Sequence, residues 1–206
     1  MAVSKSSKRW LDEHFDDEYV KRSREDGYRS RAVYKLIEMH QKQKLIRKGM
    51  NILDLGAAPG GWSQYCAQIN GDAGRVVATD ILPVDPMANV EFIQGDFRED
   101  DVLEALLEVT GDEKYDLVIS DMAPNISGVD SVDQPKSIYL CELALDMSTR
   151  TLKKDGNFVV KLFQGAGSDE YVKEVRKHFK TTKILKPKAS RQRSREVYIL
   201  GKGFVV

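Results

Sequence analysis

The chain has 206 residues, of which 41% are hydrophobic and 31% charged, so it is long enough for one domain with a sizeable core and short for two. No apolar run approaches the ~18–20 residues that span a bilayer, and the charged N-terminus lacks the apolar centre of a secretory signal, so we expect a cytoplasmic protein outside the membrane. The formal net charge of zero hides basic ends and an acidic middle: Lys+Arg against Asp+Glu is 13 to 8 over residues 1–48, 10 to 23 over 49–176 and 9 to 1 over 177–206.

The predicted elements begin with a helix over residues 29–46, which follows a basic segment rich in Arg and Tyr. Five apolar runs predict buried strands, because continuous hydrophobicity is typical of a parallel sheet covered on both faces. These runs are 50–56, 75–81, 90–96, 115–121 and 157–163. Helices are predicted between and after them at 61–69, 101–109, 137–154 and 169–179, and the segment 129–137 is expected to be a loop. The alternation indicates an α/β doubly wound sheet.

The C-terminal part departs from this alternation. Two strand-like runs, 180–187 and 195–206, follow each other without a helix, which predicts an antiparallel pair at the end of the sheet. We therefore expect a single domain over residues 1–206, with a basic N-terminal extension and helix (1–48) and a sheet core that ends in a basic strand pair (49–206). The histidines and the two cysteines, Cys66 and Cys141, have no ligand spacing, so no metal site is expected.

Charged residues end the predicted strands. Asp54, Asp80, Asp96, Asp121 and Lys161 each lie at or near the carboxyl end of one apolar run. In an open parallel sheet, ligands bind beyond these ends, at the point where the strand order reverses. An acidic residue at such a place can also cap the following helix, so each one taken alone has an ordinary structural explanation.

The loop Gly56–Ala57–Ala58–Pro59–Gly60–Gly61 lies between the first strand and its helix. Its glycines permit a tight turn and a close approach of the backbone to a ligand. Ala58 occupies the second glycine position of a dinucleotide loop, and Pro59 lacks an N–H that could bind a pyrophosphate, which argues against an NAD-dependent dehydrogenase. No Gly-Lys-Ser/Thr follows, so the loop is not a P-loop.

The next two strand ends favour an adenosine-containing ligand. Asp80 follows Gly56 by 24 residues, where a carboxylate would accept hydrogen bonds from both ribose hydroxyls. Asp96 and Phe97 are placed to meet an adenine. S-adenosylmethionine fits better than NAD, because it carries an adenosine and a cationic tail without a phosphate, and an acidic rim suits that cation.

Five motifs carry a resemblance to a known family. "DLGAAPGGWSQ", "GDF", "SDMAPNISG", "VVKLFQG" and "SREVYI" occur in an order that resembles the FtsJ (RrmJ-like) ribosomal RNA 2′-O-methyltransferases. The resemblance implies a Rossmann-like class I methyltransferase with a seven-stranded, mostly parallel sheet, an antiparallel last strand and helices on both faces. It also implies cofactor contacts for S-adenosylmethionine at Gly60, Trp62, Asp80, Asp96 and Asp121.

The family's catalytic set has a match at Lys35, Asp121, Lys161 and Glu196. A ribose 2′-hydroxyl must lose its proton to attack a methyl group, and a lysine can take that proton only when it is neutral. The hypothesis is that Lys161 is the base, that Asp121 orients it, and that Lys35 and Glu196 position the ribose. Each residue has a simpler alternative, such as a solvated lysine, an ion pair with a neighbouring arginine, or a loop cap.

The basic segments predict an RNA partner, because cations neutralise phosphates and aromatic rings stack on unpaired bases. The candidate RNA-binding residues are Arg29, Arg31, Lys188, Arg191, Arg193 and Arg195. By resemblance the target is a uridine in the aminoacyl-site loop of 23S ribosomal RNA, within the large ribosomal subunit, and the protein is a monomer. The alternatives are a transfer RNA 2′-O-methyltransferase, an amino-group methyltransferase, because "DMAPN" resembles part of that class's motif, and a non-catalytic RNA-binding assembly factor.

Overall fold

The structure is a computed structural model that describes residues 17–110 and 114–205. The part of the predicted N-terminal extension at residues 1–16 lies outside the described residues. The helices are α2 (Glu18–Glu25), α3 (Val33–Gln43), α4 (Gly61–Asn70), α5 (Asp100–Thr110), α6 (Asp130–Thr151) and α7 (Ser168–His178). The strands are β1 (Asn51–Leu55), β2 (Arg75–Asp80), β3 (Val90–Gln94), β4 (Tyr115–Ser120), β5 (Leu152–Phe163), β6 (Phe179–Leu185) and β7 (Glu196–Phe204).

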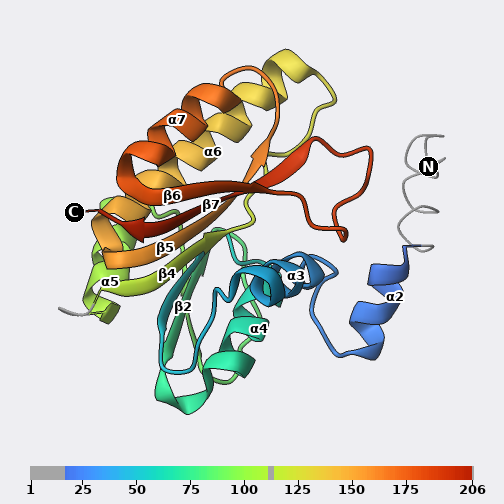
Figure 1. Cartoon of the computed structure of the whole chain (residues 1–206). Helices are drawn as coiled ribbons and strands as arrows, with labels where there is room; N and C mark the ends of the chain where they lie inside the picture. The colour runs from blue at the N-terminus through green and yellow to red at the C-terminus, as the bar shows by residue number, and fades with distance from the viewer. Residues whose placement is uncertain (1–16, 111–113, 206) are drawn as a thin grey trace.

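The strands form one seven-stranded sheet in the order β3-β2-β1-β4-β5-β7-β6 (Figure 1). Neighbours from β3 through β5 pair in parallel, whereas β7 lies antiparallel between β5 and β6. This confirms the predicted Rossmann-like sheet, its antiparallel last strand and its C-terminal strand pair. The strand order reverses between β1 and β4, so the crevice where a ligand is expected lies beyond the ends of these two strands.

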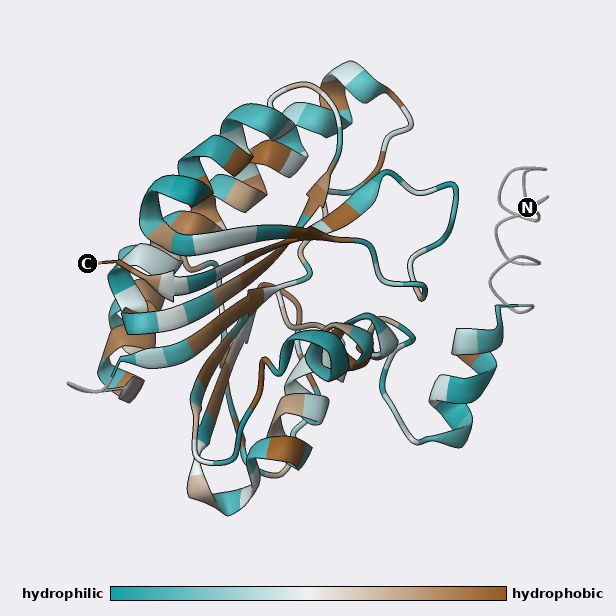
Figure 2. Cartoon of the chain, in the orientation of Figure 1, coloured by the Kyte–Doolittle hydropathy of each residue, from teal (hydrophilic) through white to brown (hydrophobic). Residues whose placement is uncertain are grey.

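Helices cover both faces of the sheet, as the continuous apolar runs predicted. α5, α6 and α7 pack on one face, and α3 and α4 pack on the other (Figure 1). Successive residues of β5 alternate between the two cores, since Val159 faces α3 and α4 while Val160 faces α6 and α7. Figure 2 shows the hydrophobic residues concentrated in the strands and on the sides of the helices that face them. Within the described residues, no helix has the length and apolar character that a membrane span requires.

The prediction for the longest helix was wrong at both ends. α6 begins at Asp130, within the segment expected to be a loop, because the Asp133 carboxylate accepts hydrogen bonds from the backbone N–H groups of Ser127 and Gly128 and holds the preceding loop against the first helical turn. Residues 152–154 belong to β5 instead of the helix, and the register between β4 and β5 shifts after Leu152. The polar first turn and the Lys-Lys-Asp-Gly segment at 153–156 carry no apolar periodicity that would mark these boundaries.

The helix predicted over residues 29–46 is shorter in the structure. α3 covers only Val33–Gln43 and ends at Lys44, whose backbone is left-handed with φ of 55°. A separate helix, α2, precedes it, and its N-cap is Asp17, whose side chain accepts a hydrogen bond from the N–H of Tyr19 at 3.0 Å.

Candidate active site

Four charged side chains meet beyond the carboxyl ends of β4 and β5, and they are the four that the sequence predicted to be catalytic. Lys161 Nζ lies 3.2 Å from Asp121 Oδ1 and also donates a hydrogen bond to the backbone carbonyl of Asp121. Lys35 Nζ lies 2.8 Å from Glu196 Oε1. Lys35, Lys161 and Glu196 are 7%, 8% and 8% exposed and Asp121 is partly buried, so the cluster consists of two largely buried ammonium–carboxylate pairs.

The antiparallel pairing of β5 and β7 brings these residues together. Lys161 is opposite Tyr198, and Phe163 is opposite Glu196. Residues two apart on a strand share a face, and so do residues opposite each other on paired strands. The side chains of these two pairs therefore project to the same side of the sheet. α3 packs on that side and contributes Lys35, whose Nζ lies 5.7 Å from the centre of the Tyr198 ring.

The electrostatics of the cluster keep both carboxyl groups ionised. Burial raises the pKa of Asp121, but the charges of Lys161 and Lys35, together with hydrogen bonds from Tyr198 and Lys161, outweigh it and hold that pKa below its usual value. Burial likewise raises the pKa of Glu196, but the ion pair with Lys35 outweighs burial and holds this pKa below its usual value too. The two carboxylates therefore remain available as acceptors across the neutral range.

Tyr198 also belongs to this site, although it is not among the residues predicted from the sequence motifs. Its hydroxyl donates a hydrogen bond to Asp121 Oδ1 at 2.6 Å, and burial raises the pKa of this phenol well above its usual value, so the hydroxyl keeps its proton. The signal that could have found it is the strand alternation, because Tyr198 is two residues after Glu196 on the same strand.

A cavity of about 530 Å³ opens beside the cluster, beyond the ends of β1, β2, β3 and β4. Its lining includes five of the predicted cofactor residues, namely Gly56, Asp80, Asp96, Phe97 and Asp121. The exposed apolar side chains of Ile81 and Leu82 also line it. The sequence did not single out the wall from α6, which includes Lys136 and Tyr139.

The cavity fits an adenosine-bearing cation such as S-adenosylmethionine. A volume of this size suits a ligand of nucleoside dimensions. Gly56 adopts a left-handed φ of +72°, and a Cβ there would lie 2.1 Å from Met122 Cγ, so this turn requires glycine. Asp80 accepts hydrogen bonds from the backbone N–H groups of Ala58 and Leu82, which fix its carboxylate at the cavity wall. The acidic residues suit a cationic group, and the apolar side chains suit a purine.

Asp96 is paired within the structure. Its carboxylate accepts hydrogen bonds from the Arg98 guanidinium, including 2.9 Å and 2.8 Å contacts from Nε, and this pairing holds the pKa of Asp96 below its usual value. Arg98 also lines the cavity, so an adenine that approaches Asp96 meets a carboxylate already fixed by a guanidinium.

Gly60 and Trp62, the other two predicted cofactor contacts, are not in the lining of this cavity. Trp62 is buried in the core beneath α3, where its Nε1–H donates a hydrogen bond to the Ala32 carbonyl and its ring lies 5.7 Å from that of Tyr198. Gly60 begins α4 with a left-handed φ of +102°. Trp62 therefore packs behind the charged cluster, against the ring of Tyr198.

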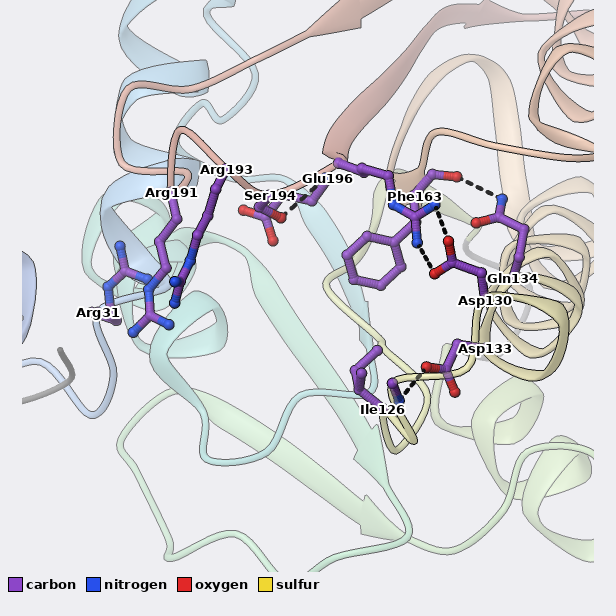
Figure 3. A pocket seen from close by; sticks show the side chains of 12 residues that line it. Arg31, Ile126, Asp130, Asp133, Gln134, Phe163, Arg191, Arg193, Ser194 and Glu196 are labelled. Atoms are coloured by element: carbon purple, nitrogen blue, oxygen red, sulfur yellow. Dashed lines mark hydrogen bonds and ion pairs between the residues drawn. The ribbon is translucent and has the colours of Figure 1, made fainter. Parts of the chain in front are cut away.

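A second cavity, of about 500 Å³, lies at the end of β5 and the start of β7 (Figure 3). Four predicted RNA-binding residues line it, namely Arg31, Arg191, Arg193 and Arg195. Arg29 does not, because its guanidinium donates hydrogen bonds to the carbonyls of Asp85 and Pro86 at 2.6 Å and 2.9 Å. Lys188 is also outside the lining, and its backbone N–H donates to Glu38 Oε2.

Asp54 provides a test of the electrostatics beneath the site. This carboxyl is 1% exposed, and its pKa is raised to about 7. Burial is the main cause, and the charges of Asp121 and Asp80 add to it, whereas a hydrogen bond from Ser63 acts in the opposite direction. Because the folded pKa lies above the unfolded value of 3.8, the contribution of Asp54 to stability is complete below about pH 4 and is lost as the pH rises towards 7.

The Asp54→Asn variant should lack this loss of stability, which amounts to as much as about 4 kcal/mol. Urea unfolding of the ligand-free protein between pH 4.5 and 8 measures it, and Asp146→Asn, an exposed site, should retain the pH dependence of the unaltered chain.

The fold and the two adjoining cavities define a Rossmann-like methyltransferase. The family model described as FtsJ-like methyltransferase matches residues 28–204, so the chain belongs to the FtsJ-like methyltransferase family. This confirms the family that the five sequence motifs indicated.

Two known proteins illustrate the relationship. The chain is 60% identical over 205 residues to a protein of Cellvibrio japonicus (strain Ueda107) named "Ribosomal RNA large subunit methyltransferase E", with 100% of this chain and 97% of that protein covered. Among solved structures, a ribosomal RNA methyltransferase from Plasmodium falciparum superposes with a TM-score of 0.76 at 31% identity, over 86% of this chain and 98% of that one.

Proposed function

We propose that the protein transfers the methyl group of S-adenosylmethionine to a ribose 2′-hydroxyl of large-subunit ribosomal RNA, at a uridine in the aminoacyl-site loop. The observation that carries the proposal is the position of the charged cluster between the two cavities. Asp121 lines the acidic cavity that fits the cofactor, and Glu196 lines the arginine-rich cavity that suits RNA. The cluster thus contributes one carboxylate to each cavity.

The chemistry follows from the cluster's own groups. Bound S-adenosylmethionine would supply an electrophilic methyl group on a sulfonium. A ribose hydroxyl is a weak nucleophile at neutral pH, so it must lose its proton as it attacks. Lys161 first releases one ammonium proton to solvent, and its neutral Nζ then accepts the proton of the hydroxyl, while Asp121 keeps the amine in place through the 3.2 Å contact. Lys35 and Glu196, held to each other at 2.8 Å, position the ribose.

The similar proteins support the choice of substrate. The Cellvibrio japonicus relative is named for methylation of large-subunit ribosomal RNA, and it matches this chain over its full length. The match covers 100% of the chain, so it includes the segments that line both cavities.

Label transfer with a chemical readout tests the function. The protein should transfer radiolabelled methyl groups from S-adenosylmethionine to large-subunit RNA from cells that lack the gene, offered naked or as assembled subunits. A 2′-O-methyl group blocks alkaline cleavage at its own nucleotide, so the label should emerge in a dinucleotide after alkaline hydrolysis. Label in a mononucleotide would indicate base methylation and contradict the proposal, as would label found only in transfer RNA.

RNA binding should be strongly salt-dependent, because Lys and Arg side chains that neutralise phosphates release counterions. The Arg191→Ala variant should weaken binding uniformly across RNA sequences and reduce the slope of log affinity against log salt by about 1. The matched control is Lys177→Ala on α7, an exposed lysine outside both cavities, which should leave the slope unchanged. Fluorescence anisotropy with a labelled RNA hairpin over a salt series measures both slopes, and an equal slope for Arg191→Ala would remove this arginine from the interface.

A further inference from the structure

The arginine-rich cavity has one apolar surface whose position relative to Lys161 is informative. Most residues that line the cavity are polar or charged, but the ring of Phe163 and the side chain of Ile126 project into it (Figure 3). Ile126 is 62% exposed, and Phe163 is partly exposed. Among the described residues, Phe163 belongs to neither core cluster and its ring has no aromatic partner. A large aromatic side chain therefore faces open space in a site that otherwise suits a polyanion.

The strand geometry sets the distance between this ring and the reacting groups. Lys161 and Phe163 are two residues apart on β5, so their side chains share one face at a spacing of about 6.6 Å along the strand. Glu196 lies opposite Phe163 in the register with β7. A ribose held between Lys161 and Glu196 would therefore have its base within reach of the Phe163 ring, since a base is bonded to the carbon next to the one that carries the 2′-hydroxyl.

The end of β5 that carries the ring is held firmly. Gln134 of α6 donates hydrogen bonds from its Nε2 to the Phe163 carbonyl at 2.9 Å and to the Ala166 carbonyl at 3.2 Å. A Cβ on Gly165 would lie 2.8 Å from the Gln134 side chain, which shows how closely the turn packs on α6. A ring on a fixed backbone loses little further freedom when a base stacks on it.

The opposite wall supplies surplus positive charge for the phosphates. Among the residues that the structure describes, Arg31 and Arg191 both face the single carboxylate of Asp17, at 3.1 Å and 3.7 Å, so two guanidiniums share this one negative charge. Arg195 differs, because both oxygens of Asp130 accept hydrogen bonds from it, at 2.6 Å and 3.3 Å. The excess charge thus lies on the Arg31–Arg191 side, across the cavity from the α6 residues (Figure 3).

We propose that this cavity holds the base of the nucleotide being methylated, stacked on the ring of Phe163, with the adjoining phosphate at Arg31 and Arg191. The inference rests on the proposed function and adds to it a specificity-determining residue. Base–aromatic stacking of this kind changes affinity by about 5- to 150-fold. Phe163 would hold the ribose in place through its base, without contact to the transferred methyl group.

The test compares two RNAs and three forms of the protein. One RNA carries uridine at the methylated position, and the other carries 5,6-dihydrouridine, which keeps the ribose and the hydrogen-bonding groups of the base but loses its planar π-system. The unaltered protein should prefer the uridine RNA in kcat/KM by about 5- to 150-fold. Phe163→Leu, which keeps an apolar side chain without a π-face, should lose activity on the uridine RNA and methylate both RNAs at similar rates. Phe163→Tyr should retain the preference.

The controls separate a local effect from a general one. Ile69→Ala on α4, an exposed apolar residue outside both cavities, should leave the preference unchanged, and all variants should bind S-adenosylmethionine with unaltered affinity. An equal loss on both RNAs for Phe163→Leu, or no preference in the unaltered protein, would overturn the base site while leaving the proposed function intact. Failure of the unaltered protein to methylate either RNA would overturn both.

Discussion

Replacement of Lys161 by alanine is expected to reduce methyl transfer by about 10²- to 10⁴-fold, the usual contribution of a general base. Binding of S-adenosylmethionine should change little, because Lys161 is not in the lining of the cavity of about 530 Å³. Isothermal titration with the cofactor and single-turnover transfer to RNA measure the two properties separately. Lost transfer with retained cofactor binding would support the assignment, whereas normal transfer would remove Lys161 from the mechanism.

A second substitution distinguishes a base from a mere positive charge. Lys161→Arg keeps a cation next to Asp121 but cannot give up its proton in a protein. This variant should therefore retain more thermal stability than Lys161→Ala and remain as inactive. Substantial transfer by Lys161→Arg would show that charge alone suffices at this position. Lys173→Ala, an exposed lysine on α7, serves as the matched control and should behave like the unaltered protein.

Breaking the Lys35–Glu196 pair is expected to have the largest effect on stability. The two side chains are 8% and 11% exposed, so Lys35→Met leaves a nearly buried carboxylate without its cation, at a cost of roughly 3–5 kcal/mol. Loss of the Lys35 charge also allows the pKa of Glu196 to rise, so the destabilisation should shrink as the pH falls and this carboxyl becomes protonated. Denaturant unfolding at pH 5 and pH 8 measures the difference.

The double variant Lys35→Met/Glu196→Gln completes a mutant cycle. Removal of both charges leaves no uncompensated ion, so most of the lost stability should return while methyl transfer remains low. The exposed pair Asp146–Arg150 on α6 offers the matched control, and its cycle should yield a much smaller coupling energy. Additive effects at Lys35 and Glu196 would contradict the view that these two groups stabilise each other.

The sequence predicted those parts of the site that depend on a strand's own pattern. Asp80, Asp121 and Lys161 lie at or near the ends of apolar runs, and the carboxyl ends of parallel strands meet at one edge, so their convergence follows from the α/β alternation. The strand pair 180–187 and 195–206 was predictable in the same way, because no helix separates the two runs. These inferences need only local hydrophobicity and the topology that it implies.

The remaining features depend on contacts between distant segments. Tyr198 reaches Asp121, 77 positions away in the chain, only because β7 pairs with β5 in one particular register. Arg29 and Arg195 resemble other surface arginines in sequence. In the structure, however, Arg29 donates hydrogen bonds to the carbonyls of Asp85 and Pro86, and Arg195 donates to the carboxylate of Asp130. Composition cannot distinguish an arginine engaged within the protein from one that is available to RNA.

The position of β7 has a consequence for the newly made chain. Of the seven strands that the structure describes, β7 is the last to be synthesised, yet it lies inside the sheet, and β6 pairs with β7 alone among them. Until Glu196 and Tyr198 emerge, Lys35 lacks its carboxylate and Asp121 lacks its phenol. Translation delivers N-terminal segments first, so the strands β1 to β6 are all made before Glu196 and Tyr198 can join the sheet. A chain that stops short of Glu196 therefore lacks the partners of both Lys35 and Asp121, so the proposed reaction centre is incomplete.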